Sequence, residues 1–289
     1  MDPVLDVVYN TTLLITLWGT GFAVGLSASP AEAASPLKRP SLLLRAAGLD
    51  MVAIPVVVWA LLQVASLPQD QEIGLLLVGA AAAGPLGIKA AQIAGADAGL
   101  AFAVVVLLEM SNAVAMPLMA AILIPEGVEV PVGNILGTLV VVVVLPVVGG
   151  WAVRARYGRA GGWVKPLTVV TNVTTVVAVA AVVVRYWESI VDGLQAGAGW
   201  VALVTVVFAL VAGWVVGGPE RQTRLTLSLV TGIRANALAL AVAKTSYPDR
   251  PGVTTVIVTF AFVSVFLPLG TAAVFGLARP SRGARASEV

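Results

Sequence analysis

Four ionisable residues lie inside otherwise apolar stretches of the chain: Asp50, Lys89, Glu109 and Arg234. Their neighbours are mostly Leu, Val, Ala, Ile and Gly. In a lipid-embedded chain, a charge near the bilayer centre costs about 2.5–3.5 kcal/mol or more, so such residues face the protein interior and pair with opposite charges. The two acids and two bases together carry no net charge. We therefore interpret the four residues as a buried site for an ion or a charged substrate.

The composition indicates a membrane protein. Hydrophobic residues make up 59% of the 289 residues and charged residues 11%, with a mean hydropathy of +0.98. These values are typical of a polytopic membrane protein and exclude an ordinary soluble domain. The chain has no cysteine and no histidine, so the parts of thiolate metal sites and of the usual catalytic triads are missing. We expect no enzyme, no cofactor and no nucleic-acid partner.

Nine stretches are long enough to cross a bilayer, which takes roughly 20 apolar residues. The predicted spans are 8–28, 42–66, 73–92, 98–124, 132–154, 163–187, 195–217, 223–245 and 252–277. We expect an all-α polytopic fold that forms a single membrane domain over residues 1–289, with a polar tail at 278–289. A signal peptide at the first span is the disfavoured alternative, because the segment before it carries Asp2 and Asp6 and no base.

The connecting loops carry opposite charges on the two sides of the membrane. With nine spans, one side holds the bases Lys38, Arg39, Arg45, Arg154, Arg156, Arg159, Lys165, Arg221, Arg224, Arg279, Arg282 and Arg285. The other side holds Asp70, Glu72, Glu126, Glu129, Asp192 and Asp249. Basic loops are preferentially cytoplasmic. We therefore expect the N-terminus outside and the C-terminus in the cytoplasm, in a bacterial inner membrane.

Two of the predicted spans contain residues that interrupt a helix. These residues are Gly84, Pro85 and Gly87 before Lys89 in the third span, and Gly232 before Arg234 and Asn236 in the eighth. Proline removes a backbone hydrogen bond and glycine weakens the helix. Broken helices survive in membranes only where protein or a water-filled cavity satisfies the freed backbone groups. A simple kink is the alternative for each break, but the charge beside each one favours a site.

The two interrupted spans occupy corresponding positions in two halves of the chain. The third and eighth spans are five apart and cross in opposite directions, and the same offset relates the first to the sixth, the second to the seventh and the fourth to the ninth. The fifth span has no partner. This pattern predicts an inverted repeat that lacks its first span. Interrupted spans in corresponding positions are typical of transporter binding sites.

Three further features have ordinary structural interpretations. Asp97 is expected to cap the following helix. Arg185 and Lys244 lie near span ends, where we expect their side chains to reach the membrane surface. The polar run at residues 171–175 lines a cavity or packs against another helix, and the sequence leaves both alternatives open.

Several short motifs follow one another in a fixed order along nearly the whole chain. They are Trp18-Gly-Thr-Gly21, Lys38-Arg39-Pro40, Pro55, Ala83-Gly-Pro-Leu-Gly87, Gly95-Ala-Asp97-Ala-Gly-Leu100, Pro117 and Gly232-Ile-Arg-Ala-Asn-Ala-Leu-Ala-Leu-Ala241. Together they resemble the bile acid:sodium symporter family. The resemblance implies nine or ten spans, a panel domain packed against a core domain, and two broken helices that cross at the substrate and sodium sites. It also implies alternating-access transport of organic anions.

The chain departs from that family at the sodium ligands which the resemblance implies. The family's eighth-span pattern is Glu-Val-Gly-Met-Gln-Asn-Ser-Gly-Leu-Ala, in which the Glu and the Gln bind sodium. In this chain Val230 and Arg234 align with that Glu and Gln. Asp50 aligns with a Gln ligand of the second span, and Glu109 aligns with a Thr ligand of the fourth. A Ser-Asn pair of the third span aligns with about Gly87 and Ile88, next to Lys89. An acid is therefore replaced by Val, and cations stand at or beside ligand positions.

A tethered guanidinium or ammonium can supply the positive charge that a bound sodium ion would supply. We predict that Arg234 with Asp50 replaces the second ion, and that Lys89 with Glu109 replaces the first. The chain is then a transporter of a small organic anion that does not strictly depend on sodium. It works by uniport, exchange or proton-linked transport, with Glu109 or Asp50 as the proton carrier.

Two alternatives remain open from the sequence. One is sodium symport through oxygen ligands of Glu109, Ser111, Asn112 and Asn236. The other is a membrane sensor or scaffold that has lost transport, which we disfavour because only a short polar tail follows the last span. The expected partners are a small organic anion and the lipid bilayer.

Overall fold

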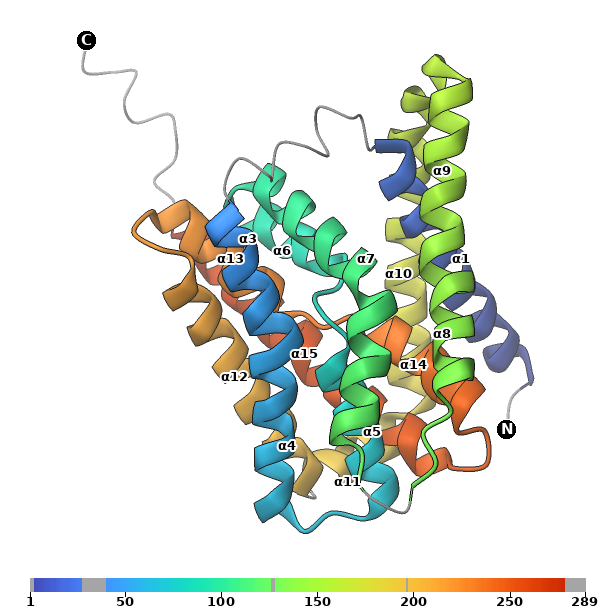
Figure 1. Cartoon of the computed structure of the whole chain (residues 1–289), viewed down its shortest axis with the longest axis vertical. Coiled ribbons are helices and arrows are strands. Elements are labelled where there is room, and N and C mark those ends of the chain that lie inside the picture. The colour runs from blue at the N-terminus through green and yellow to red at the C-terminus, as the bar shows by residue number, and fades with distance from the viewer. Residues whose placement is uncertain (1–2, 28–39, 126–127, 196, 279–289) are drawn as a thin grey trace.

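The computed structural model describes residues 3–27, 40–125, 128–195 and 197–278 (Figure 1). Within these residues the regular structure is helical, apart from one isolated β-bridge. Six helical stretches in the described part are long and apolar enough to cross a membrane: Pro40–Ala65, Ala98–Leu123, Val132–Arg156, Gly158–Arg185, Gly197–Val216 and Pro251–Leu277. The predicted all-α polytopic membrane fold is therefore confirmed.

One helix or a series of helices occupies each of the nine predicted ranges. In chain order these are α1 (Pro3–Ser27), α3–η2–α4 (Pro40–Gly48, Leu49–Ala53, Ile54–Ala65), α5 and α6 (Gln69–Ala80, Leu86–Ala94), α7 (Ala98–Leu123), α8–η3–α9 (Val132–Leu139, Val140–Val144, Leu145–Arg156), η4–α10 (Gly158–Trp163, Val164–Arg185), α12 (Gly197–Val216), α13 and α14 (Arg221–Gly232, Asn236–Ser246) and α15 (Pro251–Leu277). The short helix α11 (Trp187–Gln195) was not predicted. The count of nine membrane crossings stays a prediction.

The helices form two groups, which we call the panel and the core (Figure 1). The panel consists of α1, α8–η3–α9 and η4–α10, and α1 packs against both α9 and α10. Small residues allow this close packing: a Cβ atom on Gly25 would collide with the carbonyl oxygen of Val147, and one on Gly150 would collide with that of Phe22. The remaining helices form the core.

The two predicted breaks are present, and the unwound segments cross inside the core. One segment separates α5 from α6, and the other separates α13 from α14. They run antiparallel at a bridge between Ala83 and Arg234. The amide of Gly84 donates to the carbonyl of Ile233 at 2.8 Å, and the amide of Ala235 donates to that of Ala82 at 2.8 Å. Each segment thus satisfies freed backbone groups of the other, as the membrane interior requires.

Some predicted features lie outside the described residues. They are Lys38 and Arg39 of the first basic loop, Glu126, and the predicted polar tail from residue 279 onwards with Arg279, Arg282 and Arg285.

The predicted topology can be tested by labelling introduced cysteines, because the natural chain has none. Gln69→Cys and Asp249→Cys should react from outside intact cells with an impermeant thiol reagent, whereas Gly158→Cys should react only after the membrane is opened. All three positions are exposed. Labelling of residue 158 from outside would overturn the nine-span arrangement.

Candidate functional site

The ion pair predicted between Arg234 and Asp50 is present at the crossing. Arg234 is 2% exposed and Asp50 0% exposed. One terminal nitrogen of Arg234, Nη1, donates to Asp50 Oδ1 at 2.5 Å. The other, Nη2, donates to the carbonyl of Asp50 at 3.1 Å and to that of Gly79 at 2.7 Å. The guanidinium thus connects η2, the last turn of α5 and the crossing.

Both carbonyls are ones that their helices leave free. In η2 the amide of Ile54 donates to the carbonyl of Leu49, one residue further back than in an α-helix. In this π-type pattern the carbonyl of Asp50 would accept from residue 55, but Pro55 has no N–H. The carbonyl of Gly79 lies in the last turn of α5, which ends at Ala80. Pro55 and the helix break therefore create the acceptors that Arg234 fills.

Asn112 on α7 supports the crossing from a second direction. Its Oδ1 accepts from the backbone amide of Ala82 at 2.8 Å. Because that amide can only donate, the orientation of the Asn112 side chain is fixed with its oxygen on Ala82. The nitrogen Nδ2 is buried without a hydrogen bond of normal geometry. Asn112 therefore stabilises the break between α5 and α6.

Asn236, the first residue of α14, holds the other break. Its Nδ2 donates to Ser264 Oγ on α15 at 2.8 Å. Ser264 can direct its own hydrogen to the carbonyl of Ala261 at 3.4 Å, which leaves its oxygen to accept from Asn236. The side-chain oxygen of Asn236 is therefore the free end, and it is buried without a hydrogen bond.

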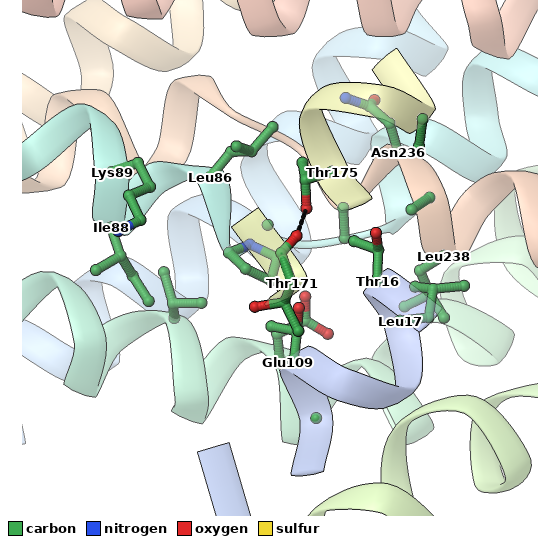
Figure 2. A pocket seen from close by; sticks show the side chains of 18 of the residues that line it. Thr16, Leu17, Leu86, Ile88, Lys89, Glu109, Thr171, Thr175, Asn236 and Leu238 are labelled. Atoms are coloured by element: carbon green, nitrogen blue, oxygen red, sulfur yellow. Dashed lines mark hydrogen bonds between the residues drawn. The ribbon is translucent and has the colours of Figure 1, made fainter. Parts of the chain in front are cut away.

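A cavity of about 440 Å³ lies between the panel and the core, beside the crossing (Figure 2). This volume is within the usual range for small-molecule sites. Most of the lining is apolar. The polar residues include Thr16 of α1, Lys89 of α6, Glu109 of α7, Thr171 and Thr175 of α10, and Asn236. The cavity thus combines an apolar wall with a few polar groups, as is typical of ligand pockets.

The predicted ion pair between Lys89 and Glu109 is absent from the structure. Both residues line the cavity and are half-buried, but no Lys89 nitrogen lies within 4.0 Å of a Glu109 oxygen. A Cβ on Gly87 would meet Val230 Cα at 3.0 Å, so this face of α6 packs against α13. Lys89 lies two residues, or about 200°, further round the helix and points the other way. Figure 2 shows Lys89 and Glu109 on different sides of the pocket.

The other predicted residues have structural roles. Ser111 donates to the carbonyl of Leu107 at 2.8 Å and does not line the cavity. Gly232 ends α13, where a Cβ would lie 2.8 Å from Leu210 Cδ2. Gly84 and Pro85 belong to the unwound segment and line the cavity.

The panel contributes polar groups that were only partly expected. Thr16 donates to Thr174 at 3.0 Å, whereas Thr171 and Thr175 line the cavity. The polar run at 171–175 therefore both packs against α1 and lines the cavity. Thr16 and Thr20, four residues apart on α1, also line the cavity and were missed. Their spacing on one helical face was the available signal. As predicted, Asp97 caps α7, with its side chain accepting from the amide of Leu100 at 3.0 Å.

The chain is similar in sequence to known membrane transporters. The family model of the Sodium Bile acid symporter family matches residues 14–192. Two proteins of Arabidopsis thaliana are similar over most of the chain: the probable sodium/metabolite cotransporters BASS5, chloroplastic, at 24% identity over 84% of this chain, and BASS6, chloroplastic, at 25% identity over 82%. The matches cover 64% and 63% of these relatives, so the chain spans less than two thirds of their length.

The contact between Asp50 and Arg234 predicts strong coupling between their substitutions. Arg234→Gln or Asp50→Asn alone should lower stability by about 3–5 kcal/mol, because each leaves an unpaired buried charge. The double variant should recover ~1 to 3 kcal/mol relative to the sum of the two. Thermal unfolding of the purified protein in detergent measures this cycle, and additive effects would show that the two side chains do not interact.

The crossing also predicts that Gly84 tolerates no side chain. A Cβ there would lie 2.7 Å from the carbonyl oxygen of Arg234, which is backbone and cannot move aside cheaply. Gly84→Ala should therefore cost about 1–3 kcal/mol. Gly137→Ala on α8 is the matched control, since nothing lies within 4 Å of its Cβ position. Equal melting temperatures for the two variants would contradict the close crossing.

Proposed function

Because the chain belongs to the Sodium Bile acid symporter family, we propose that it transports a small organic anion through the cavity between panel and core without strict dependence on sodium. The family consists of membrane transporters, not enzymes. The observation that carries the proposal is the buried guanidinium of Arg234, which stands at a position that the family resemblance assigns to a sodium ligand and binds Asp50 and two backbone carbonyls.

A bound sodium ion would supply a unit positive charge to this crossing and hold unwound carbonyl groups in place. The Arg234 guanidinium supplies the same charge permanently and donates to two such carbonyls. The acidic sodium ligand that the resemblance implies is replaced by Val230. A sodium ion at this position would therefore face a fixed cation and lack its carboxylate ligand.

The conformation supports transport by alternating access. The cavity lining extends from Ser27 at the end of α1 and Val164 at the start of α10, on the side that we expect to be cytoplasmic, to Ile190 of α11 toward the other side. At the opposite end, panel and core are joined by a hydrogen bond of 2.8 Å between Thr138 and Thr245, and by one of 2.8 Å from Lys244 to Asn10. We infer an inward-facing state, in a protein of the bacterial inner membrane.

Sodium symport is the second candidate, because two oxygen-bearing side chains near the crossing lack a partner for an oxygen atom among the described residues. The side-chain oxygen of Asn236 has no hydrogen-bond partner, and Glu109 has no cationic partner in the described part of the chain. The similar plant proteins are also named as sodium/metabolite cotransporters. However, Asn112 Oδ1 is already bound to Ala82, and Ser111 is bonded within its own helix.

Ion replacement distinguishes the two candidates. A thermal-shift screen of short carboxylates should first identify a ligand, since a ligand of the folded state raises the melting temperature. Uptake of that ligand into proteoliposomes should then change little when sodium is replaced by potassium or choline. A tenfold loss of uptake without sodium, equivalent to ~1.4 kcal/mol of coupling, would instead favour sodium symport.

A further inference from the structure

The charges that face the cavity point to a more specific ligand. Resting on the transport function proposed above, we propose that the cavity binds a zwitterion with an apolar body. Its carboxylate lies at Lys89, and its ammonium group lies at Glu109 and the side-chain oxygen of Asn236. The substrate class is thus an apolar amino acid rather than a simple carboxylate.

The cavity contains two side chains of opposite charge that have no ion-pair partner among the described residues. Arg234 and Asp50 neutralise each other at the crossing. Lys89 and Glu109 do not, although both line the same cavity, and Lys89 makes no hydrogen bond or ion pair within the described residues. A charged side chain in a membrane interior is costly unless it has a partner of opposite charge. A ligand with one negative and one positive group satisfies both side chains.

The hydrogen bond to Ser264 sets the orientation of the Asn236 side chain. This residue is 8% exposed and lines the cavity, and Ser264 holds its nitrogen, so its oxygen is the group left free. A buried carbonyl oxygen without a hydrogen bond costs about 1–3 kcal/mol, which a donor in the cavity would recover. An ammonium group has three N–H donors, so it can bond to more than one acceptor of the cavity.

A ligand that has only a carboxylate fits this arrangement less well. It would satisfy Lys89, but the Asn236 oxygen would stay without a donor and Glu109 without a positive charge. The Asn112 amide lies beside Glu109 but makes no hydrogen bond of normal geometry to it. Lys89 and Glu109 lie on different sides of the pocket, so a ligand between them can meet one with its carboxylate and the other with its ammonium group (Figure 2).

The rest of the lining determines the body of the ligand. Val142 and Val143 of the panel and Phe262 and Val265 of α15 line the same cavity as the charged residues. Apolar walls of this kind bind hydrocarbon by removing it from water. The two charged groups therefore fix the orientation of the ligand, and the apolar part contributes affinity.

The test compares matched ligands that differ by one ammonium group. Leucine is paired with 4-methylpentanoate, and 6-aminohexanoate with hexanoate, and each is titrated against the full-length protein in detergent by thermal shift and calorimetry. At least one zwitterion should bind at least tenfold more tightly than its carboxylate partner. Glu109→Gln should weaken the binding of that zwitterion at least tenfold and abolish the preference. Ser111→Ala, two residues along α7 but outside the cavity, should keep it.

Each other outcome is decisive. Equal or tighter binding of the plain carboxylates to the natural protein overturns the zwitterion but leaves organic-anion transport standing. Retention of the preference in Glu109→Gln also overturns it. Binding of neither class contradicts both the proposed transport function and the ligand. Each variant is compared with its own ligand-free melting temperature, so a general loss of stability does not affect the reading.

Discussion

The structure depends on a single guanidinium group placed where two broken helices cross. Unwinding a helix in a membrane exposes backbone groups that water cannot reach, and each unsatisfied group costs several kcal/mol. The two unwound segments satisfy part of this need by bonding to each other. Arg234 satisfies more, by donating to the carbonyls of Asp50 and Gly79 while Asp50 balances its charge. The pair therefore organises the crossing, whatever its net contribution to stability.

A tethered cation has a consequence for transport that a free ion does not. A sodium ion couples transport to the sodium gradient because it binds on one side of the membrane and leaves on the other. Arg234 cannot leave, so in the proposed function this position holds the crossing together and transmits no gradient. The groups free to act on a substrate are then those of the cavity, above all Lys89, Glu109 and Asn236.

The sequence predicted the helical ranges and both breaks, because apolar length and the glycine and proline signals are local. It also predicted the pair of Asp50 and Arg234, because both residues align with ligands of one ion. The predicted ion pair between Lys89 and Glu109 was wrong, because the direction of the Lys89 side chain depends on how α6 restarts after the break. Sequence analysis missed α11, which at nine residues is too short to register as a span. The free oxygen of Asn236 could not be predicted from the sequence, because its orientation follows from the hydrogen bonds of Ser264.

The central claim is that Arg234 takes the place of a sodium ion. Melting temperatures in sodium and in potassium, for the natural protein and for a triple variant that restores the implied ligands (Arg234→Gln, Asp50→Gln and Val230→Glu), test it most directly. The natural protein should unfold at the same temperature in both salts, and the triple variant should be stabilised by sodium but not by potassium. Stabilisation of the natural protein by sodium, lost in the triple variant, would contradict the claim.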